Sequence, residues 1–443
     1  MKKPTVPPGV GEVLEETQRA DRLNAVLETL SKPSWPDRYL HWHKLRHHKP
    51  PTGLSHREWW LALKLHRYSQ YRTVPLRSAG GIPFNYVLSD PAPERLHDID
   101  LRLGGSIGMP SPITNPDTKD QYLVRSLIEE AITSSQLEGA ATTRSEAKDM
   151  IRSGRPPRDR SEQMILNNYR TMQQIGKLKH KPLTKKIVLE LHRLVTDGAL
   201  NDPADVGRIR RADQKIDVGD DLGQVFHVPP PADQLDDRMA EMCNFANGRT
   251  PSRFIHPVVR SIILHFWLAY DHPFVDGNGR TARALFYWSM LHHGFSLCEF
   301  ISISEIILKA PAKYGRAFLY TETDDNDLTY FLLYHLDVLR RAIKQLHDYV
   351  VRRTERIQAV ERRMRTAQVL NHRQQALISH ALRHIGHRYT IESHRTSHNV
   401  VHQTARTDLL DLARRGLMTK EKIGRQWHFT PVTDLERRLT KLS

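Results

Sequence analysis

Cysteine is the scarcest chemistry-bearing residue in this chain, since only Cys243 and Cys298 occur among its 443 residues. Two cysteines cannot build the set of disulfides that holds small secreted domains together, so we expect a reducing, cytoplasmic setting. Neither cysteine has a second ligand at the spacing of a zinc finger, and that class of metal site is therefore not expected.

Long apolar runs are also missing. No apolar stretch reaches about 18 residues, the length that a membrane-spanning helix needs, so we expect no membrane association. The start of the chain passes from Lys2 and Lys3 into Pro4, Pro7 and Pro8 without an apolar segment, which argues against a signal peptide. The hydrophobic share of 39% is ordinary for a soluble protein, and the length predicts two or three domains.

Acidic residues are too few to balance the basic ones. The chain has 66 lysines and arginines against 50 acidic residues, and its formal net charge is +16. This excess favours an acidic partner, with nucleic acid as the first candidate, because a basic surface attracts phosphate backbones. A generally basic soluble protein without such a partner is the alternative.

The stretch His272–Arg283, with the sequence His-Pro-Phe-Val-Asp-Gly-Asn-Gly-Arg-Thr-Ala-Arg, concentrates more chemistry than any other part of the chain. The flanking segments 254–270 and 281–291 are apolar and too long for strands, so each predicts a helix. The turn signal between Asp276 and Gly279 places the second helix start near Asn278 or Gly279. The motif is therefore predicted to be a tight loop between two helices.

A helix start in this loop predicts an anion site. Unpaired backbone N–H groups, the positive end of the helix dipole and glycines that permit close approach all suit a phosphate. Arg280 and Arg283 project from one face, and a guanidinium binds phosphate in bidentate fashion. Asp276 supplies a hard oxygen ligand, which indicates Mg²⁺. His272 precedes the loop as a candidate general base.

The same twelve residues match in full the signature His-x-Phe-x-(Asp/Glu)-Gly-Asn-Gly-Arg-x-x-Arg, so the chain resembles the Fic-domain proteins. The resemblance implies an all-helical fold, and most members transfer AMP from ATP to a hydroxyl side chain of a target protein. It implies that His272 is the catalytic base and that Phe274 anchors the loop. The further implied roles are Mg²⁺ binding by Asp276, a phosphate cradle of Gly277, Asn278 and Gly279, β/γ-phosphate binding by Arg280 and γ-phosphate binding by Arg283.

A second motif lies at residues 127–139, where an apolar face predicts a helix that Gly139 ends. Glu138 lies at the C-terminal end of this helix. The helix dipole is negative there and disfavours an acidic side chain, so a cation is expected nearby. Ser134, Glu138 and Gly139 resemble the Fic inhibitory helix, (Ser/Thr)-x-x-x-Glu-(Gly/Asn), in the class that carries it on the N-terminal side. The resemblance implies that Glu138 pairs with Arg283 and prevents productive binding of ATP.

The remaining helices follow from apolar periodicity and caps. The predicted helices cover residues 12–31, a segment opened by a capping box of Ser55 and Glu58, 161–175, 183–195 and 297–307. Residues 214–228 are expected to form a short β-hairpin, and the resemblance implies a flap that binds the target segment by strand pairing. The acidic turn 324–327 is predicted to cap a long helix, whose apolar seam suits packing on the core or a homodimeric coiled coil.

The C-terminal stretch predicts three helices and a pair of strands around Gly424, a pattern that resembles a winged helix-turn-helix. Its third helix, residues 399–415, would present the side chains Gln403, Thr404, Arg406 and Thr407 for contact with base edges or phosphates. A basic rim would consist of Arg414, Arg415, Lys420, Lys422 and Arg425. DNA binding through residues 366–443 is one expectation, and a protein contact is the other.

Together these features predict a mainly α protein with a Fic-type helical core, a short β-hairpin flap and a C-terminal winged helix domain. The predicted segments are an N-terminal helical extension (1–115), a catalytic core (116–330) with an inhibitory helix near 124–139, a connecting helix (331–365) and the winged helix (366–443). The predicted function is autoinhibited, Mg²⁺-dependent transfer of AMP from ATP to a Ser, Thr or Tyr hydroxyl of a target protein. The alternatives are a DNA-binding regulator with the core as sensor or self-modifier, and transfer or removal of a different phosphate-containing group.

Overall fold

The computed structural model describes residues 2–30, 39–104, 116–220, 222–367, 369–384, 386–423 and 426–442. Residue contacts divide the chain into two units. Unit 1 comprises Met1–Ile107 and Arg125–Ile343, and unit 2 comprises Gly108–Val124 and Lys344–Ser443. Two of the dividing points fall inside helices, one in α7 (Pro116–Leu137) and one in α16 (Thr329–Ala367).

Unit 1 begins with four helices, which we call the N-terminal module. They are α1 (Val10–Arg19), α2 (Leu23–Leu30), α3 (Trp42–Leu45) and α4 (His56–Gln70). Their own apolar core includes Val13, Val26, Leu45, Trp59 and Trp60. The predicted helix over residues 12–31 is wrong in its continuity, because the chain breaks after α1 and Asp21 has a positive φ. The predicted capping box of Ser55 and Glu58 is present at the start of α4.

A hairpin and one helix connect this module to the catalytic region. Strands β1 (Arg72–Arg77) and β2 (Pro83–Tyr86) pair antiparallel, and α5 (Ala92–Leu103) follows with Gly104 at its C-terminal end. The helices that come next in unit 1 are the Arg125–Leu137 part of α7, α8 (Arg144–Ser153), α9 (Arg160–Leu178), α10 (Lys185–Thr196), α11 (Leu235–Ala246), α12 (Pro257–Asp271) and α13 (Asn278–His292).

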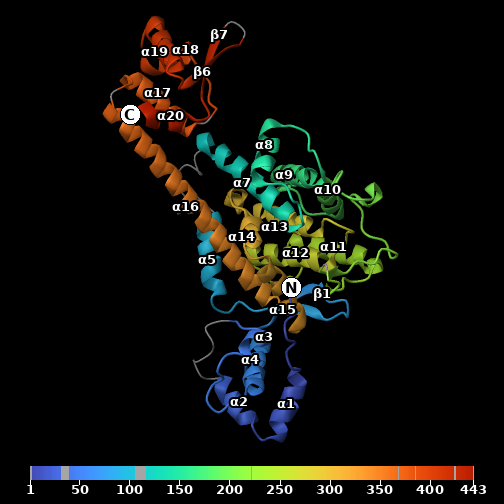
Figure 1. Cartoon of the computed structure of the whole chain (residues 1–443). Helices are drawn as coiled ribbons and strands as arrows, with labels where there is room; N and C mark the ends of the chain where they lie inside the picture. Colours follow the sequence, from blue (N-terminus) through green and yellow to red (C-terminus); the bar gives the residue numbers. More distant parts are fainter. Residues whose placement is uncertain are drawn as a thin grey trace. The chain divides into compact units, whose positions relative to one another are not determined.

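Helices α12 and α13 lie at the centre of unit 1, packed against each other and against α9, α10 and α11 (Figure 1). Thirteen of the fifteen residues of α12 are buried, as expected for a helix that is covered on all sides. Between α10 and α11 lies the predicted hairpin, which is reduced to β3 (Val218–Gly219) and β4 (Val225–His227). Residues 296–308 do not form the single predicted helix, because the 3₁₀ segment Ser296–Phe300 and α14 (Ile303–Leu308) are separate.

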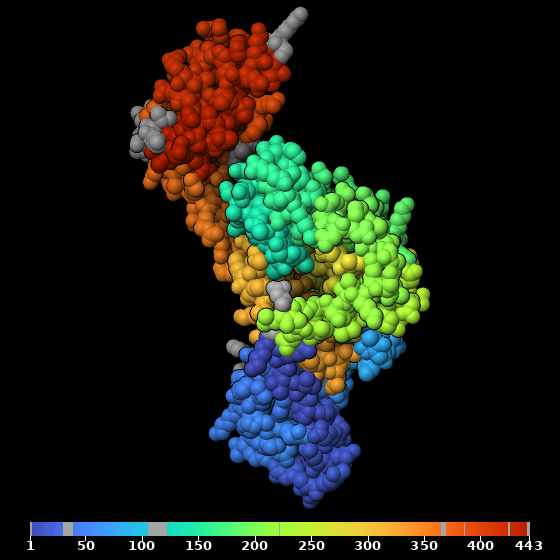
Figure 2. All heavy atoms as spheres, turned by 45° about the vertical axis from the view of Figure 1, so that its right-hand side comes forward, coloured from blue at the N-terminus to red at the C-terminus, as the bar shows by residue number. Residues whose placement is uncertain are grey.

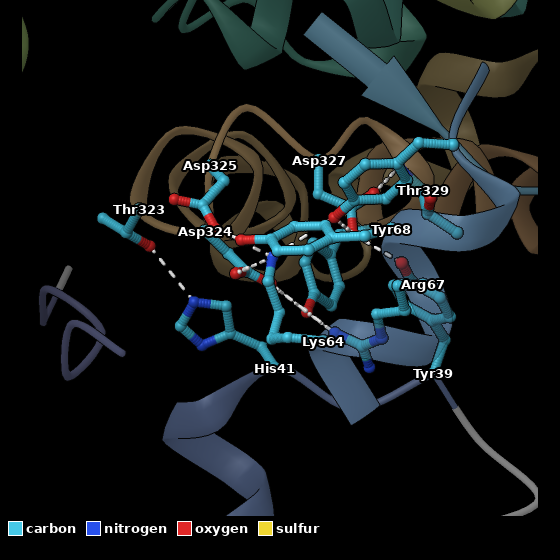
Figure 3. Close-up of polar contacts among 12 residues, drawn as sticks. Tyr39, His41, Lys64, Arg67, Tyr68, Thr323, Asp324, Asp325, Asp327 and Thr329 are labelled. Atoms are coloured by element: carbon cyan, nitrogen blue, oxygen red, sulfur yellow. Dashed lines mark hydrogen bonds and ion pairs between the residues drawn. The ribbon is translucent and has the colours of Figure 1, made fainter. Parts of the chain in front are cut away.

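Helix α15 (Pro311–Thr323) ends in the acidic turn 324–327, which does more than cap α16. Figure 3 shows the charged side chains of α4 converging on this turn. The ammonium of Lys64 lies 2.7 Å from the Asp324 carboxylate, and both side chains are buried. Arg67 donates to the Tyr330 hydroxyl at 2.8 Å, and that hydroxyl donates to Asp324 at 2.6 Å. The acidic turn is therefore the partner of two buried cations that lie about 260 residues earlier.

Aromatic side chains complete this cluster. The hydroxyls of Tyr39 and Tyr71 both donate to Asp327, at 2.5 and 3.1 Å. His41 stacks on Tyr320 of α15 with ring centroids 4.3 Å apart, and its Nε2 lies 3.2 Å from the Thr323 hydroxyl. These contacts hold the C-terminal end of α15 against the N-terminal module (Figure 3).

Unit 2 contains the Lys344–Ala367 part of α16 and the elements that follow it. They are α17 (His372–Arg383), β5 (Tyr389–Thr390), α18 (Ile391–His398), α19 (His402–Arg414), β6 (Met418–Ile423), β7 (Gln426–Pro431) and α20 (Leu435–Leu442). The strands form one antiparallel sheet in the order β5-β7-β6. Ile357, Val360 and Met364 of α16 belong to the same apolar core as α17, α19 and the sheet. The apolar seam of this half of α16 therefore packs within its own unit.

Candidate functional site

The His272–Arg283 motif forms the loop between α12 and α13, and α13 begins at Asn278 as predicted. Gly277 precedes the helix with a φ of +83°, a conformation that glycine adopts without steric cost. The side chain of Asn278 accepts a hydrogen bond from the Phe274 N–H at 3.0 Å and donates to the Phe274 carbonyl at 2.8 Å. This pair of bonds closes the loop on itself and fixes the helix start.

His192 of α10 packs against the loop and supports it, a role that the sequence did not predict. Its ring stacks on Phe274 with centroids 3.7 Å apart. Its Nδ1 accepts from the Gly207 N–H at 3.1 Å, so its Nε2 carries the proton and donates to the Asp276 carbonyl at 2.9 Å. Burial lowers the pKa of His192 to about 4, which keeps this tautomer neutral. The sequence signal that could have identified His192 is a histidine within the otherwise apolar face of the predicted helix 183–195.

The two arginines of the motif lie buried beside the start of α13. Arg280 donates to the Val195 carbonyl at 3.0 Å, and its Nε and Nη2 have no hydrogen-bond partner among the described residues. The Nη1 of Arg283 is also without such a partner in the described part of the chain. Buried donors normally find acceptors. Unsatisfied guanidinium donors beside a helix start therefore indicate a site that takes an anionic ligand.

Glu138 occupies part of that anion site. Its Oε1 accepts a hydrogen bond from Arg283 Nη2 at 2.8 Å, so the ion pair that the resemblance implies is present. Arg283 also donates to the hydroxyl of Ser134 at 2.8 Å and to its carbonyl at 2.9 Å. A Cβ on Gly279 would lie 2.1 Å from the same carboxylate oxygen. A side chain at position 279 would therefore displace the Glu138 carboxylate from its place at the helix start.

Helix α7 is anchored deep in the core by a carboxylate that sequence reasoning also missed. Glu130 is buried, and it accepts hydrogen bonds from the hydroxyls of Tyr287 at 2.9 Å and Ser302 at 2.8 Å and from the Ser304 N–H at 3.1 Å. Gly139 ends the segment with a φ of +90°. These contacts fix the helix that presents Ser134 and Glu138.

His272 ends α12 in a left-handed conformation, with a φ of 45°. Its Nδ1 lies 3.3 Å from the Ala269 carbonyl, which favours a proton on Nδ1 and leaves the Nε2 lone pair as an acceptor. Burial lowers the pKa of His272 to about 4, so the ring is neutral at pH 7. The backbone carbonyl of His272 accepts from Arg210 Nε at 3.1 Å, a second support that the sequence did not indicate.

Asp276 supplies the carboxylate of the loop, and 37% of its side chain is accessible. One oxygen lies 3.2 Å from Arg160 and the other 3.6 Å from Arg280. Among the described residues there is no group of three His, Cys, Asp or Glu side chains that could bind a metal ion. A magnesium ion held by one carboxylate together with the phosphates of a nucleotide requires no such group, so the donor set fits that arrangement.

A cavity of about 220 Å³ opens beside His272. The apolar part of its lining consists of Val218, Phe226, Ala269, Tyr314, Phe318 and Leu319. Its polar lining includes Glu138, His227 and Glu322. Figure 2 shows this face of unit 1 hollowed between the teal helical residues near 125–150 and the yellow-green segment that carries the hairpin. The hairpin thus borders a cavity that contains both predicted catalytic and predicted inhibitory side chains.

Comparison with protein families places a Fic domain at this site, because residues 182–290 match the Fic/DOC family. Three similar proteins are named protein adenylyltransferase Fic or fic-1. The protein from Nematostella vectensis is 33% identical over 117 residues, and those from Drosophila virilis and Caenorhabditis briggsae are 36% identical over 113 and 33% identical over 116. Each match covers 26% of this chain, and the chain spans only 21–25% of the length of these relatives.

Among solved structures, a Fic family protein from Desulfovibrio desulfuricans G20 has a similar fold. The two share 19% sequence identity with a TM-score of 0.50, and the match covers 76% of this chain and 94% of the other. The likeness therefore extends well beyond residues 182–290, and it supports a Fic-type helical fold. No helix in the described part of the chain has the length and apolar character to cross a membrane.

Proposed function

We propose that this protein is an autoinhibited protein adenylyltransferase, which transfers AMP from ATP to a Ser, Thr or Tyr hydroxyl of a target protein. The observation that carries the proposal is the buried guanidinium of Arg283, which lies at a glycine-lined helix start and is held by Glu138. An anion site of this form suits the phosphates of a nucleotide. The adenylyltransferase names of the relatives support the nature of the transferred group.

The proposed mechanism uses His272, which lines the cavity, together with groups of the adjoining loop and of the start of α13. ATP binds with its phosphates against the N–H groups of α13, and Arg280 and Arg283 bind the terminal phosphates. The Nε2 of neutral His272 takes the proton of the target hydroxyl, whose oxygen attacks the α-phosphorus. The bond from the α-phosphorus to the bridging oxygen breaks, and pyrophosphate leaves. Asp276 would hold Mg²⁺, which supplies charge neutralisation at the α- and β-phosphates.

Autoinhibition follows from competition for one guanidinium. While Glu138 is bonded to Arg283, a phosphate at that place would meet a carboxylate of the same charge sign. The carboxylate lies directly against Gly279 at the helix start, so the obstruction is steric as well as electrostatic. Release of Glu138 makes the guanidinium of Arg283 available to bind phosphate.

The direct test is incorporation of label from α-³²P-ATP with Mg²⁺. We expect little label on the wild-type protein, strong self-labelling of Glu138→Gly, and none on Glu138→Gly/His272→Ala. A matched control is Glu241→Gly, because Glu241 is an exposed carboxylate on α11 away from the cradle. If Glu138→Gly labels neither itself nor any lysate protein, AMP transfer is refuted and the remaining candidates are another nucleotide, a phosphate or removal of AMP.

Competition among labelled nucleotides distinguishes these alternatives. Unlabelled ATP is expected to reduce labelling of Glu138→Gly more strongly than GTP, CTP or UTP. Loss of label from a modified target, with free AMP as product, would instead favour removal, for which the same pocket can hold water near the α-phosphorus. The first result would support AMP transfer from ATP, and the second would support removal of AMP.

A second function, DNA binding by unit 2, is favoured by its topology. The order α17, β5, α18, α19, β6, β7 supports the proposal of a winged helix-turn-helix, in which α19 would be the recognition helix and β6–β7 the wing. Gln403, Arg406 and Thr407 are exposed on α19, and Thr404 is half-buried. On the wing, Lys420 Nζ lies 4.1 Å above the ring of Trp427. Of the predicted basic rim, Arg425 lies outside the described residues, as does Gly424 of the turn.

The DNA proposal predicts a mobility shift that weakens steeply with salt. Binding of the full chain to duplex fragments should fall by about tenfold or more in Arg406→Glu, since a phosphate or base contact becomes a repulsion. Lys186→Glu changes the net charge equally at an exposed site on α10 and is expected to bind as the wild type does. Equal loss in both variants, or no shift at low salt, would exclude a specific role for α19.

A further inference from the structure

His227 is the last residue of β4, and both of its ring nitrogens have acceptors. Nδ1 lies 2.6 Å from Oε2 of Glu322 on α15, and Nε2 lies 2.7 Å from the carbonyl of Tyr270 near the end of α12. The ring is 9% exposed and also packs on the Tyr270 ring at 4.7 Å. The side chain of His227 thus connects the β3–β4 hairpin with α12 and with α15, which also lines the cavity.

The geometry requires two ring protons. A carboxylate and a backbone carbonyl only accept hydrogen bonds, so both nitrogens of His227 must donate and the ring must be an imidazolium. The charged groups that face it are Glu322 of α15 and Asp271 of α12, with His272 beside Asp271 and Arg238 bonded to Asp271 at 2.5 Å. Burial opposes protonation, but the bond to Glu322 and its charge outweigh burial and raise the pKa of His227.

Glu322 is a firm point of attachment. It is followed directly by Thr323 and Asp324, whose side chains contact His41 and Lys64 of the N-terminal module. Figure 3 shows Thr323 and Asp324 held in that cluster. Because the end of α15 cannot shift without breaking buried ion pairs, a bond to Glu322 restrains the hairpin and not the helix.

We infer that His227 and Glu322 form a positioning pair that fixes the β3–β4 hairpin to α12 and α15, so that a docked target hydroxyl meets His272 in a set geometry. The effect on target positioning rests on the proposed function, whereas the contacts of His227 with Glu322 and Tyr270 do not depend on it. The pair is complete while His227 carries both protons. Loss of one proton removes one of the two bonds and frees the hairpin.

Hydrogen exchange of the hairpin, followed by mass spectrometry on the full chain, tests the pair without any catalysis. In the wild type, exchange of peptides covering β3 and β4, corrected for intrinsic rates, should accelerate as rising pH deprotonates His227. His227→Gln should exchange about tenfold to a hundredfold faster at neutral pH and lose the pH step. Glu322→Gln keeps an acceptor but removes the charge, so the step should move to lower pH. His97→Gln, at an exposed histidine on α5, should match the wild type.

Hairpin exchange that is equal in the wild type and His227→Gln would overturn the inference, as would a step that Glu322→Gln leaves in place. The consequence for transfer is measured separately. Adding His227→Gln to Glu138→Gly should lower the rate of labelling from α-³²P-ATP, and undiminished labelling would contradict the positioning role. If Glu138→Gly alone shows no labelling, the proposed function fails while the exchange result still decides on the pair.

Discussion

At the scale of single residues, Arg283 is held by two side chains, the hydroxyl of Ser134 and the carboxylate of Glu138, and a substitution of Ser134 tests the first contact alone. Ser134→Ala removes the bond to Arg283 Nε but leaves the ion pair with Glu138, so we expect transfer to rise about five- to tenfold, less than in Glu138→Gly. Ser135→Ala is the matched control, because the neighbouring hydroxyl is buried and has no hydrogen-bond partner among the described residues. Labelling rates of the two variants check the prediction, and equal rates would contradict it.

The two sequence motifs predicted which side chains lie together at the site. The motif predicted that His272 and Asp276 of the loop lie near Arg280 and Arg283 in the first turns of α13, and the second motif predicted the contact of Glu138 with Arg283. The supports could not be predicted in this way. His192, Arg210 and Glu130 lie far from the motif in sequence, and each contacts it through backbone groups or neighbouring helices whose positions follow only from packing.

At the scale of elements, α4 and the acidic turn depend on each other. Lys64→Met leaves Asp324 as a buried carboxylate that has lost its closest cation, and breaking such a pair costs about 3–5 kcal/mol. We therefore expect a markedly lower midpoint of unfolding in urea, followed by tryptophan fluorescence because Trp59 and Trp60 lie in the N-terminal module. Lys344→Met breaks an exposed pair with Asp348 and should change little. Similar midpoints for both variants would refute the role of the cluster.

Most helices were predictable, because apolar periodicity and caps are local signals. Ser55 with Glu58 and Gly139 mark ends that the structure has. The two failures differ in cause. The break at Asp21 falls in the mostly polar stretch 15–22, where the apolar periodicity is interrupted in the sequence itself. The break between Phe300 and Ile303 interrupts an apolar pattern, and tertiary packing decides where such a pattern bends. The acidic turn was expected to act as a cap, but its main partners are distant cations.

At the scale of the whole molecule, buried histidines make stability depend on pH. Burial lowers the pKa of His41 and His335 to about 3 and of His192 and His272 to about 4, and it also lowers the pKa of His265 well below its usual value. In the unfolded chain these rings take up protons near pH 6.5, so the unfolded state binds more protons between about pH 6.5 and 4. Each ring then removes up to about 1.4 kcal/mol of stability for each pH unit of acidification.

Groups whose pKa is raised oppose this trend. Burial raises the pKa of Asp271 to about 6 and also raises that of Asp327, and the bond to Glu322 raises the pKa of His227 against the effect of burial, so these groups favour the folded state as pH falls. The histidines with lowered pKa outnumber them, since burial also lowers the pKa of His43, His293, His394 and His398, and we expect a lower Tm at about pH 5.5 than at about pH 7.5 in calorimetry. His335→Phe, which removes one titrating ring, should reduce the difference. A Tm that is equal at the two pH values would contradict the prediction.

The distance in sequence between Lys64 and Asp324 has a consequence for synthesis of the chain. The 260 residues between them take roughly 13–50 seconds to translate at 5–20 residues per second. During that interval the N-terminal module has left the ribosome with two cations and no acidic turn to receive them. Its surface that later meets α15 is then open to chaperones and proteases, and the module reaches its final state only when most of the chain has been made.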